Sequence, residues 1–120
     1  MSALVQLCWA LLALIHIMPA LALFRPALLT TMYGVDAGGA TYLLLHHRAA
    51  LFLGVVVLCI WASFDAGARS VAVVVTAISM IGFLLLYGQG GSPPALRTIA
   101  VVDMIGLVPL AVVAWAAIKP

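Results

Sequence analysis

The chain has 120 residues, of which 68% are apolar and only 7% are charged, with a formal net charge of +2 and a mean hydropathy of +1.34. Soluble domains carry about 25% charged residues, so a soluble fold would have almost nothing to place on its surface, and so small a net charge gives no basis for nucleic-acid binding. The composition therefore predicts a polytopic membrane protein with the lipid bilayer as its main partner. The length allows about four spans of about 20 residues with short connections.

The first apolar run predicts a membrane span over residues 3–23. It ends before Arg25-Pro26, because proline removes a hydrogen-bond donor and disfavours helix in the residue that precedes it. The segment 20–22 resembles a signal-peptide cleavage site, but no basic residue precedes the run, and the run is longer than the apolar core of a signal peptide. We therefore expect this segment to be a membrane span.

Three further spans follow the first. The longest connection comes directly after the first span, and residues 26–33 within it predict a short interfacial helix. The remaining apolar runs predict spans over residues 42–64, 70–87 and 95–118, separated by turns rich in glycine and proline. We expect a single all-α domain that covers residues 1–120 and forms an antiparallel bundle of four transmembrane helices.

The second span carries three consecutive polar residues, His46, His47 and Arg48, near its start. An arginine at the centre of a bilayer costs about 2.5 to 3.5 kcal/mol on insertion scales, and less near the interface, so the tripeptide indicates either a buried polar site or a helix end that snorkels to the headgroups. Successive helical residues are about 100° apart, so the three side chains cannot all point inward. His47 shares a face with the small residues Ala50 and Gly54, which predicts that His47 faces the interior and that Arg48 turns toward a neighbouring helix or the headgroups.

Antiparallel threading places polar side chains from all four spans on one side of the membrane. The end of the first span, the start of the second, the end of the third and the start of the fourth must meet there. At a rise of 1.5 Å per residue, the polar groups of the first, second and fourth spans lie about 6 to 10 Å inside that side. The residues brought together in this way are His16, His46, His47, Tyr87, Gln89 and Asp103. The sequence thus predicts a polar cluster in one leaflet.

One function that such a cluster supports is acid–base catalysis on a lipophilic substrate. His47 and His16 are the candidate proton-transfer groups, because histidine titrates near neutrality, and Asp103 is their candidate carboxylate partner. Arg48 would hold an anionic headgroup, a carboxylate or an oxyanion. Whether the protein is an enzyme stays open at this point.

A second function is the binding of a lipophilic or anionic small molecule without chemistry. Arg48 is then the anion-binding residue, and His46, Tyr87 and Gln89 complete the candidate ligand-binding set. A third is a haem or metal cofactor held by His16 and His47, although the chain has no closely spaced ligand pair such as HxxxH or CxxC.

The polar residues also have a purely structural interpretation. Arg48 would then pair with Asp103 across the bundle, the histidines would hydrogen-bond to tyrosines or to the backbone, and the protein would be an interaction subunit within a larger membrane assembly. A permeation function is the remaining alternative, and four short spans would need a homo-oligomer to build a pathway.

The order of short motifs along the chain carries a family resemblance. LFRP at residues 23–26, Tyr33-Gly34 in the first loop and HRAALFLG at residues 47–54 resemble small DoxX-like four-helix bacterial membrane proteins. They are also similar to a group of short inner-membrane proteins with a His in the first span, His-Arg-Ala at the start of the second and an Asp in the fourth. The resemblance implies a four-helix fold and a multi-pass location in the bacterial inner membrane.

Overall fold

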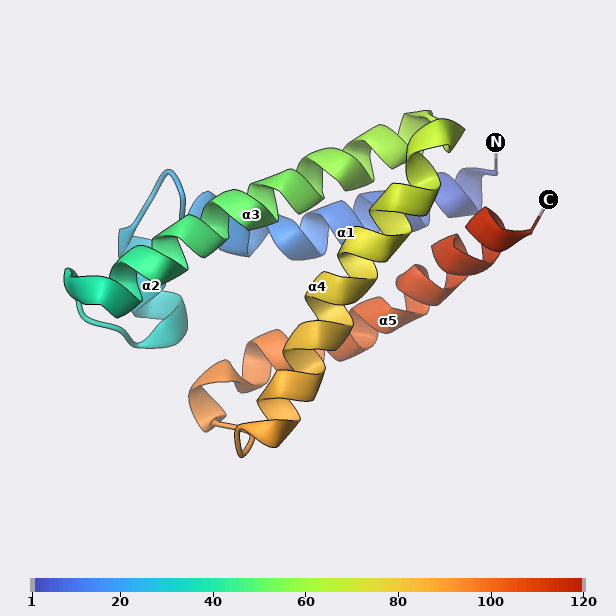
Figure 1. The fold of residues 1–120 in the computed structure, drawn as a ribbon. Helices are drawn as coiled ribbons and strands as arrows, with labels where there is room; N and C mark the ends of the chain where they lie inside the picture. Colours follow the sequence, from blue (N-terminus) through green and yellow to red (C-terminus); the bar gives the residue numbers. More distant parts are fainter. Residues whose placement is uncertain (1, 120) are drawn as a thin grey trace.

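The computed structural model describes residues 2–119 and is helical along most of this length (Figure 1). The α-helices are α1 (Ala3–Leu21), α2 (Ala27–Tyr33), α3 (Gly39–Phe64), α4 (Arg69–Gln89) and α5 (Arg97–Ile118). Two short 3-10 turns, η1 (Ala66–Ala68) and η2 (Pro94–Leu96), lead into α4 and α5. No strand occurs in residues 2–119, and the prediction of an all-α protein is confirmed.

The four long helices begin and end within three residues of the predicted spans, and the differences have local causes. α1 stops at Leu21, because the N–H groups of Leu23 and Phe24 donate to carbonyls three residues back, which is a tighter turn than an α-helix makes. α3 gains an extra turn over residues 39–41, whose side chains are small and add little to the apolar signal. The short helix α2 is present, one residue shorter than predicted.

All four long helices are long and apolar enough to cross a membrane, with mean hydropathy values between 2.0 and 2.3 in their most apolar windows. Large apolar side chains point outward along each of them, for example Leu51 on α3, Ile78 on α4 and Val108 on α5. A helix that is apolar on all its faces is typical of a membrane span or of the core of a large protein.

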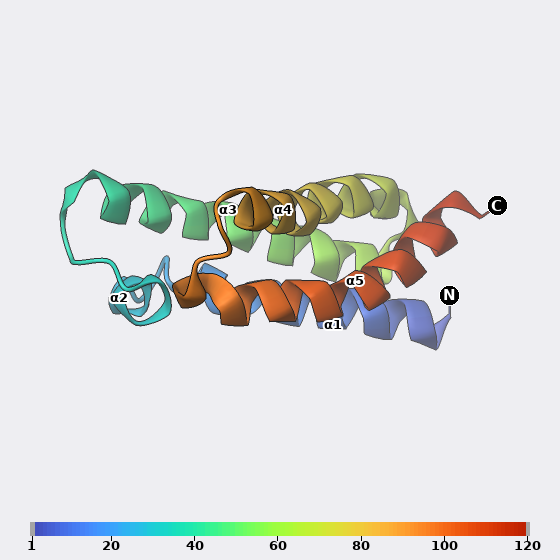
Figure 2. The same ribbon diagram turned by 90° about the horizontal axis from the view of Figure 1, so that it is seen from below.

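The long helices pack as a ring in which α1 contacts α3 and α5, and α4 contacts α3 and α5. Seen from below, α3 and α4 form one layer and α1 and α5 the other (Figure 2). The two termini lie at one end of the molecule, near the turn between α3 and α4, and the pairs α1/α3 and α4/α5 spread apart toward the opposite end (Figure 1). That opposite end carries α2 and η2, which contact each other.

The core of the ring is tightest near the middle of the helices. Trp9 and Leu12 on α1 and Met80 on α4 are completely buried. Gly106 on α5 allows the closest approach, since a Cβ atom there would stand 2.5 Å from the Met80 Cε atom and 2.7 Å from the Ile15 Cδ1 atom. Small residues at helix contacts are the common device by which membrane helices come close together.

The short helix α2 docks on the spread end through Leu29, which is completely buried against Ala22 and Ala49. α2 ends at Gly34, whose left-handed φ of 69° lets its N–H close the helix on the Thr30 carbonyl at 2.9 Å. This stop leaves Tyr33 as the last helical residue, beside the start of α3. The position of α2 therefore fixes where the Tyr33 ring lies.

Candidate functional site

A cavity of about 620 Å³ lies at the spread end of the bundle. Residues of α1, α2, α3, α4, η2 and α5 all contribute to its wall, which is mostly apolar. The polar side chains that line it are His16, Thr31, Tyr33, Arg48, Ser79, Thr98 and Asp103. A mostly apolar cavity of this size with a few convergent polar groups has the character of a small-molecule site.

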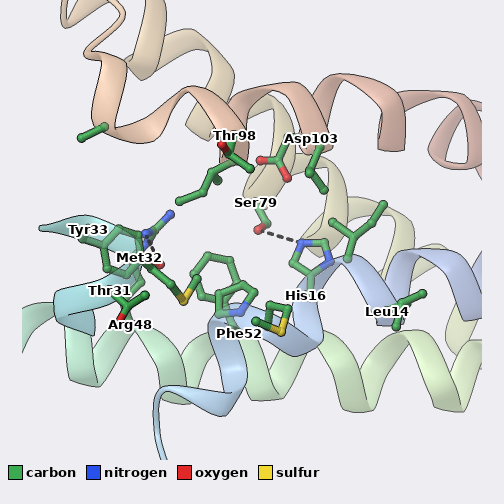
Figure 3. A pocket seen from close by; sticks show the side chains of 16 residues that line it. Leu14, His16, Thr31, Met32, Tyr33, Arg48, Phe52, Ser79, Thr98 and Asp103 are labelled. Atoms are coloured by element: carbon green, nitrogen blue, oxygen red, sulfur yellow. Dashed lines mark hydrogen bonds between the residues drawn. The ribbon is translucent and has the colours of Figure 1, made fainter. Parts of the chain in front are cut away.

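Arg48 extends into this cavity among aromatic rings (Figure 3). Its guanidinium carbon lies 4.6 Å from the centre of the Phe52 ring, 5.8 Å from that of Phe83 and 5.9 Å from that of Tyr33, all within cation–π range. Its Nη1 donates a long hydrogen bond of 3.4 Å to the Tyr33 hydroxyl. Burial raises the pKa of Tyr33, while the charge and hydrogen bond of Arg48 act in the opposite direction.

Asp103 enters the cavity from α5 and is 9% exposed. Figure 3 shows its carboxylate on the side of Ser79 and His16, away from Arg48. Within residues 2–119, no ion pair joins Asp103 to Arg48 and no donor hydrogen-bonds to the carboxylate. The direct Arg48–Asp103 pair of the structural interpretation is therefore not formed.

His16 is 2% exposed, and its two ring nitrogens have different partners. Nδ1 lies 2.8 Å from the Leu12 carbonyl oxygen, which can only accept, so the proton is assigned to Nδ1. In the neutral ring, Nε2 then carries the lone pair and accepts a 3.3 Å hydrogen bond from the Ser79 hydroxyl (Figure 3). Pro19 follows in the same helix and has no N–H, so the Ile15 carbonyl at the cavity wall lacks its usual helical donor.

The consecutive residues His46, His47 and Arg48 near the start of α3 lie in three different environments. Arg48 lines the cavity, but His47 is exposed and does not. The prediction that His47 faces the interior is wrong, because His47 lies off the buried face of α3, which consists of Ala49, Val55, Val56, Cys59 and Ala62. The face that carries His47, Ala50 and Gly54 leaves Gly54 exposed, with open space around it.

His46 is half-buried and joins two helices instead of lining the cavity. Its Nε2–H donates a 2.9 Å hydrogen bond to the Leu23 carbonyl just after α1, and its ring lies 6.4 Å from that of Tyr42. The histidine therefore holds the start of α3 against the end of α1. The structure gives His46 no contact with the predicted ligand site.

The two predicted residues at the end of α4 also lie outside the cavity. Gln89 is exposed, and the half-buried Tyr87 stacks on Phe83 with ring centres 5.9 Å apart. Phe83 in turn lies close to the Arg48 guanidinium, so Tyr87 reaches the site only through this ring.

The predicted haem or metal pair of His16 and His47 is not assembled, because only His16 lines the cavity. The described residues contain no cluster of three or more His, Cys, Asp or Glu side chains with metal-ligand geometry. The thiols of Cys8 and Cys59 are both buried and free, and Cys59 hydrogen-bonds to Thr76. The donor set of the cavity therefore does not fit the predicted His16–His47 cofactor.

Several residues that line the cavity were not among the predicted site residues: Thr31, Tyr33, Phe52, Ser79 and Thr98. The sequence contains one indication that Ser79 belongs to the site. Ser79, Phe83 and Tyr87 recur every four residues on α4 and thus share a face. This face runs from the predicted Tyr87 down to the hydroxyl that meets His16.

Fold and site together define a helical protein with four potential membrane-spanning helices and a cavity that contains an arginine, a carboxylate and a serine–histidine pair. No family model, curated protein or solved structure matches the chain. The resemblance to DoxX-like proteins thus gains no support from these comparisons and stays a prediction from short motifs.

Proposed function

We propose that this is a multi-pass membrane protein that binds an amphiphile with one anionic head and an apolar chain. In this proposal the four long helices cross the bilayer as an antiparallel bundle. Their length, their hydropathy and the large apolar side chains on their outer faces support insertion. The bilayer then supplies the ligand from the side.

The proposal rests mainly on the groups that surround the Arg48 guanidinium. Its guanidinium has five N–H donors, but the groups in direct contact with it are three aromatic rings and one neutral hydroxyl at 3.4 Å. Asp103 lines the same cavity but forms no ion pair with Arg48. A cation in a mostly apolar cavity is costly unless an anion compensates it. A carboxylate or phosphate at this position would do so, because both match the planar fork of arginine.

The apolar wall and the rim of the cavity fit the chain of such a molecule. Leu14 and Met18 on α1 and Val102 on α5 line the cavity and are also exposed, Leu14 at 61% and Met18 at 52%. The rim between α1 and α5 is therefore apolar. In a bilayer this rim would face acyl chains, so an amphiphile could enter sideways with its head directed toward Arg48.

The proposal is tested by equilibrium binding of matched single-chain amphiphiles to the purified protein. We expect hexadecanoate and hexadecyl phosphate to bind at least tenfold more tightly than hexadecanol. Arg48→Gln should abolish this preference, and Arg25→Gln, which changes an exposed arginine at the same end of the molecule, should preserve it. Equal affinity for the alcohol, or equal losses in both variants, would reject the anion site.

The anionic head could belong to a free amphiphile or to a membrane phospholipid, and these two sources can be distinguished by measurement. Mass spectrometry of molecules that copurify with the wild-type protein distinguishes a free fatty acid or alkyl phosphate from a membrane phospholipid. Arg48→Gln should lose the copurifying species, whichever of these sources supplies it.

The antiparallel crossing is tested by labelling single cysteines in intact cells or sealed vesicles. In a Cys8→Ser, Cys59→Ser background, Ser2→Cys and Gly67→Cys should react with an impermeant maleimide from one side of the membrane, and Ser92→Cys from the other. Reaction of all three from the same side would contradict the arrangement.

A further inference from the structure

We propose that Ser79 and His16 form a nucleophile–base pair that cleaves an ester of the amphiphile bound in the cavity. This inference rests on the proposed function, because Arg48 would anchor the substrate. The two side chains come from α4 and α1, 63 positions apart in the sequence. Both line the same cavity, and the Ser79 Oγ atom lies 3.3 Å from the His16 Nε2 atom.

The tautomer of His16 is the one that a general base needs. The Leu12 carbonyl accepts from Nδ1–H at 2.8 Å, which leaves the Nε2 lone pair directed at the serine hydroxyl. A base within hydrogen-bond reach of a hydroxyl, itself oriented by a third group, is the recurring arrangement of activated nucleophiles. Here a backbone carbonyl takes the orienting position.

The hydrogen bond of the Ser79 hydroxyl differs from the one that a structural serine in a membrane helix usually makes. Such a serine commonly donates to the carbonyl four residues earlier in its own helix, and the Thr31 hydroxyl makes the same type of bond to Ala27 in the short helix α2. Among residues 2–119, the hydrogen-bond partner of the Ser79 side chain is His16 on another helix. Its proton is therefore directed at the group that would remove it.

Asp103 supplies the electrostatic complement to this pair. Its carboxylate lies on the same side of the cavity as Ser79 and His16 (Figure 3). A negative charge in the same cavity favours the imidazolium that forms when His16 takes a proton. Asp103 has no hydrogen bond to Ser79 or His16, so in this scheme it contributes only its charge, and Ser79 is the residue that bonds to the substrate.

The proposed reaction is hydrolysis of an ester through an acyl-serine, with water as the second reactant. The Ser79 Oγ atom attacks the ester carbonyl carbon while its proton passes to His16 Nε2. The ester C–O bond breaks, and the departing alkoxide takes that proton and leaves as an alcohol. Water then attacks the acyl-serine, its proton passes through His16 to Ser79 Oγ, and the carboxylic acid is released.

The inference is tested by reaction of the wild-type protein with a hexadecyl fluorophosphonate, a probe that phosphonylates activated serines. We expect peptide mass spectrometry to locate the adduct on Ser79. His16→Gln should slow adduct formation by at least 100-fold, in line with the usual contribution of a general base. Ser70→Ala, which changes an exposed serine on the same helix, should react at the wild-type rate.

Hydrolysis of the mono-p-nitrophenyl ester of hexadecylsuccinate, which keeps one free carboxylate for Arg48, gives the second measurement, and Ser79→Ala should lose at least 99% of the wild-type rate. The inference is overturned when the wild-type protein binds hexadecyl phosphate but carries no adduct on Ser79 and hydrolyses the ester no faster than Ser79→Ala. That result leaves the binding function intact. Failure of the wild-type protein to bind hexadecanoate or hexadecyl phosphate removes the proposed function and this inference together.

Discussion

Arg48 and Asp103 line one cavity without forming an ion pair with each other. Arg48 lies over the ring of Phe52, whereas Asp103 shares its side of the cavity with Ser79 and His16. Closing the pair would have neutralised both charges and filled the space between them. Because the two side chains stay apart, one mostly apolar cavity contains both a positive and a negative charge. The proposed ligand site depends on this separation.

Removal of the Asp103 charge should strengthen the binding of anions. In Asp103→Asn we expect hexadecanoate to bind roughly three- to tenfold more tightly, because a like charge in a low-dielectric cavity is removed. The same variant should hydrolyse the p-nitrophenyl ester more slowly, since the imidazolium of His16 loses its carboxylate. Asp36→Asn is the control, because Asp36 is exposed in the loop between α2 and α3. Weaker anion binding in Asp103→Asn would contradict the charge assignment.

The two neighbouring histidines should differ in their effect on stability. His46→Ala removes the hydrogen bond to the Leu23 carbonyl and should lower the free energy of unfolding by about 1 kcal/mol. His47→Ala should stay within about 0.5 kcal/mol of wild type, since His47 is exposed. Thermal unfolding in detergent compares the two, and equal losses would argue against the different environments described for them.

The close approach at Gly106 predicts opposite outcomes for two glycine-to-alanine changes. Gly106→Ala places a methyl group against the fully buried Met80 and against Ile15, and we expect a loss of about 1 to 3 kcal/mol from overpacking. Gly54→Ala has open space around the new Cβ atom and should gain up to about 1 kcal/mol from helix propensity. Unfolding temperatures of the two variants provide the measurement, and the reverse order would contradict the packing.

Tyr33 predicts a loss of stability in alkali. Burial raises its pKa in the folded protein, so above about pH 10, the ordinary pKa of tyrosine, the unfolded state releases this proton before the folded state does. The stabilisation is complete below that pH and is lost as the pH rises through the folded-state pKa. Tyr33→Phe should flatten this decline. An alkaline decline in Tyr33→Phe identical to that of the wild-type protein would assign the effect elsewhere.

The helices could be predicted from the sequence because long apolar runs broken by Pro26, Asp65 and Pro93 leave few alternatives. The meeting of His16 and Asp103 at one level of the bundle was also predictable, because helical rise fixes the level of a residue along its helix. The rotation of α3 was not, since small residues mark a contact face only when a neighbouring helix comes close, and at Gly54 none does. Ser79 could not be identified as a site residue from the sequence, because its partner is the His16 ring on another helix and that pairing depends on tertiary packing.

In the proposed binding mode, an anionic amphiphile lies in the cavity with its head at Arg48. Photocrosslinking with a hexadecanoate that carries a diazirine next to its carboxylate tests this position. We predict adducts on peptides that contain Arg48, Phe52 and Tyr33, lost in Arg48→Gln and retained in Arg25→Gln. Adducts spread over the outer faces of α3 and α4, and unchanged in Arg48→Gln, would contradict this binding mode.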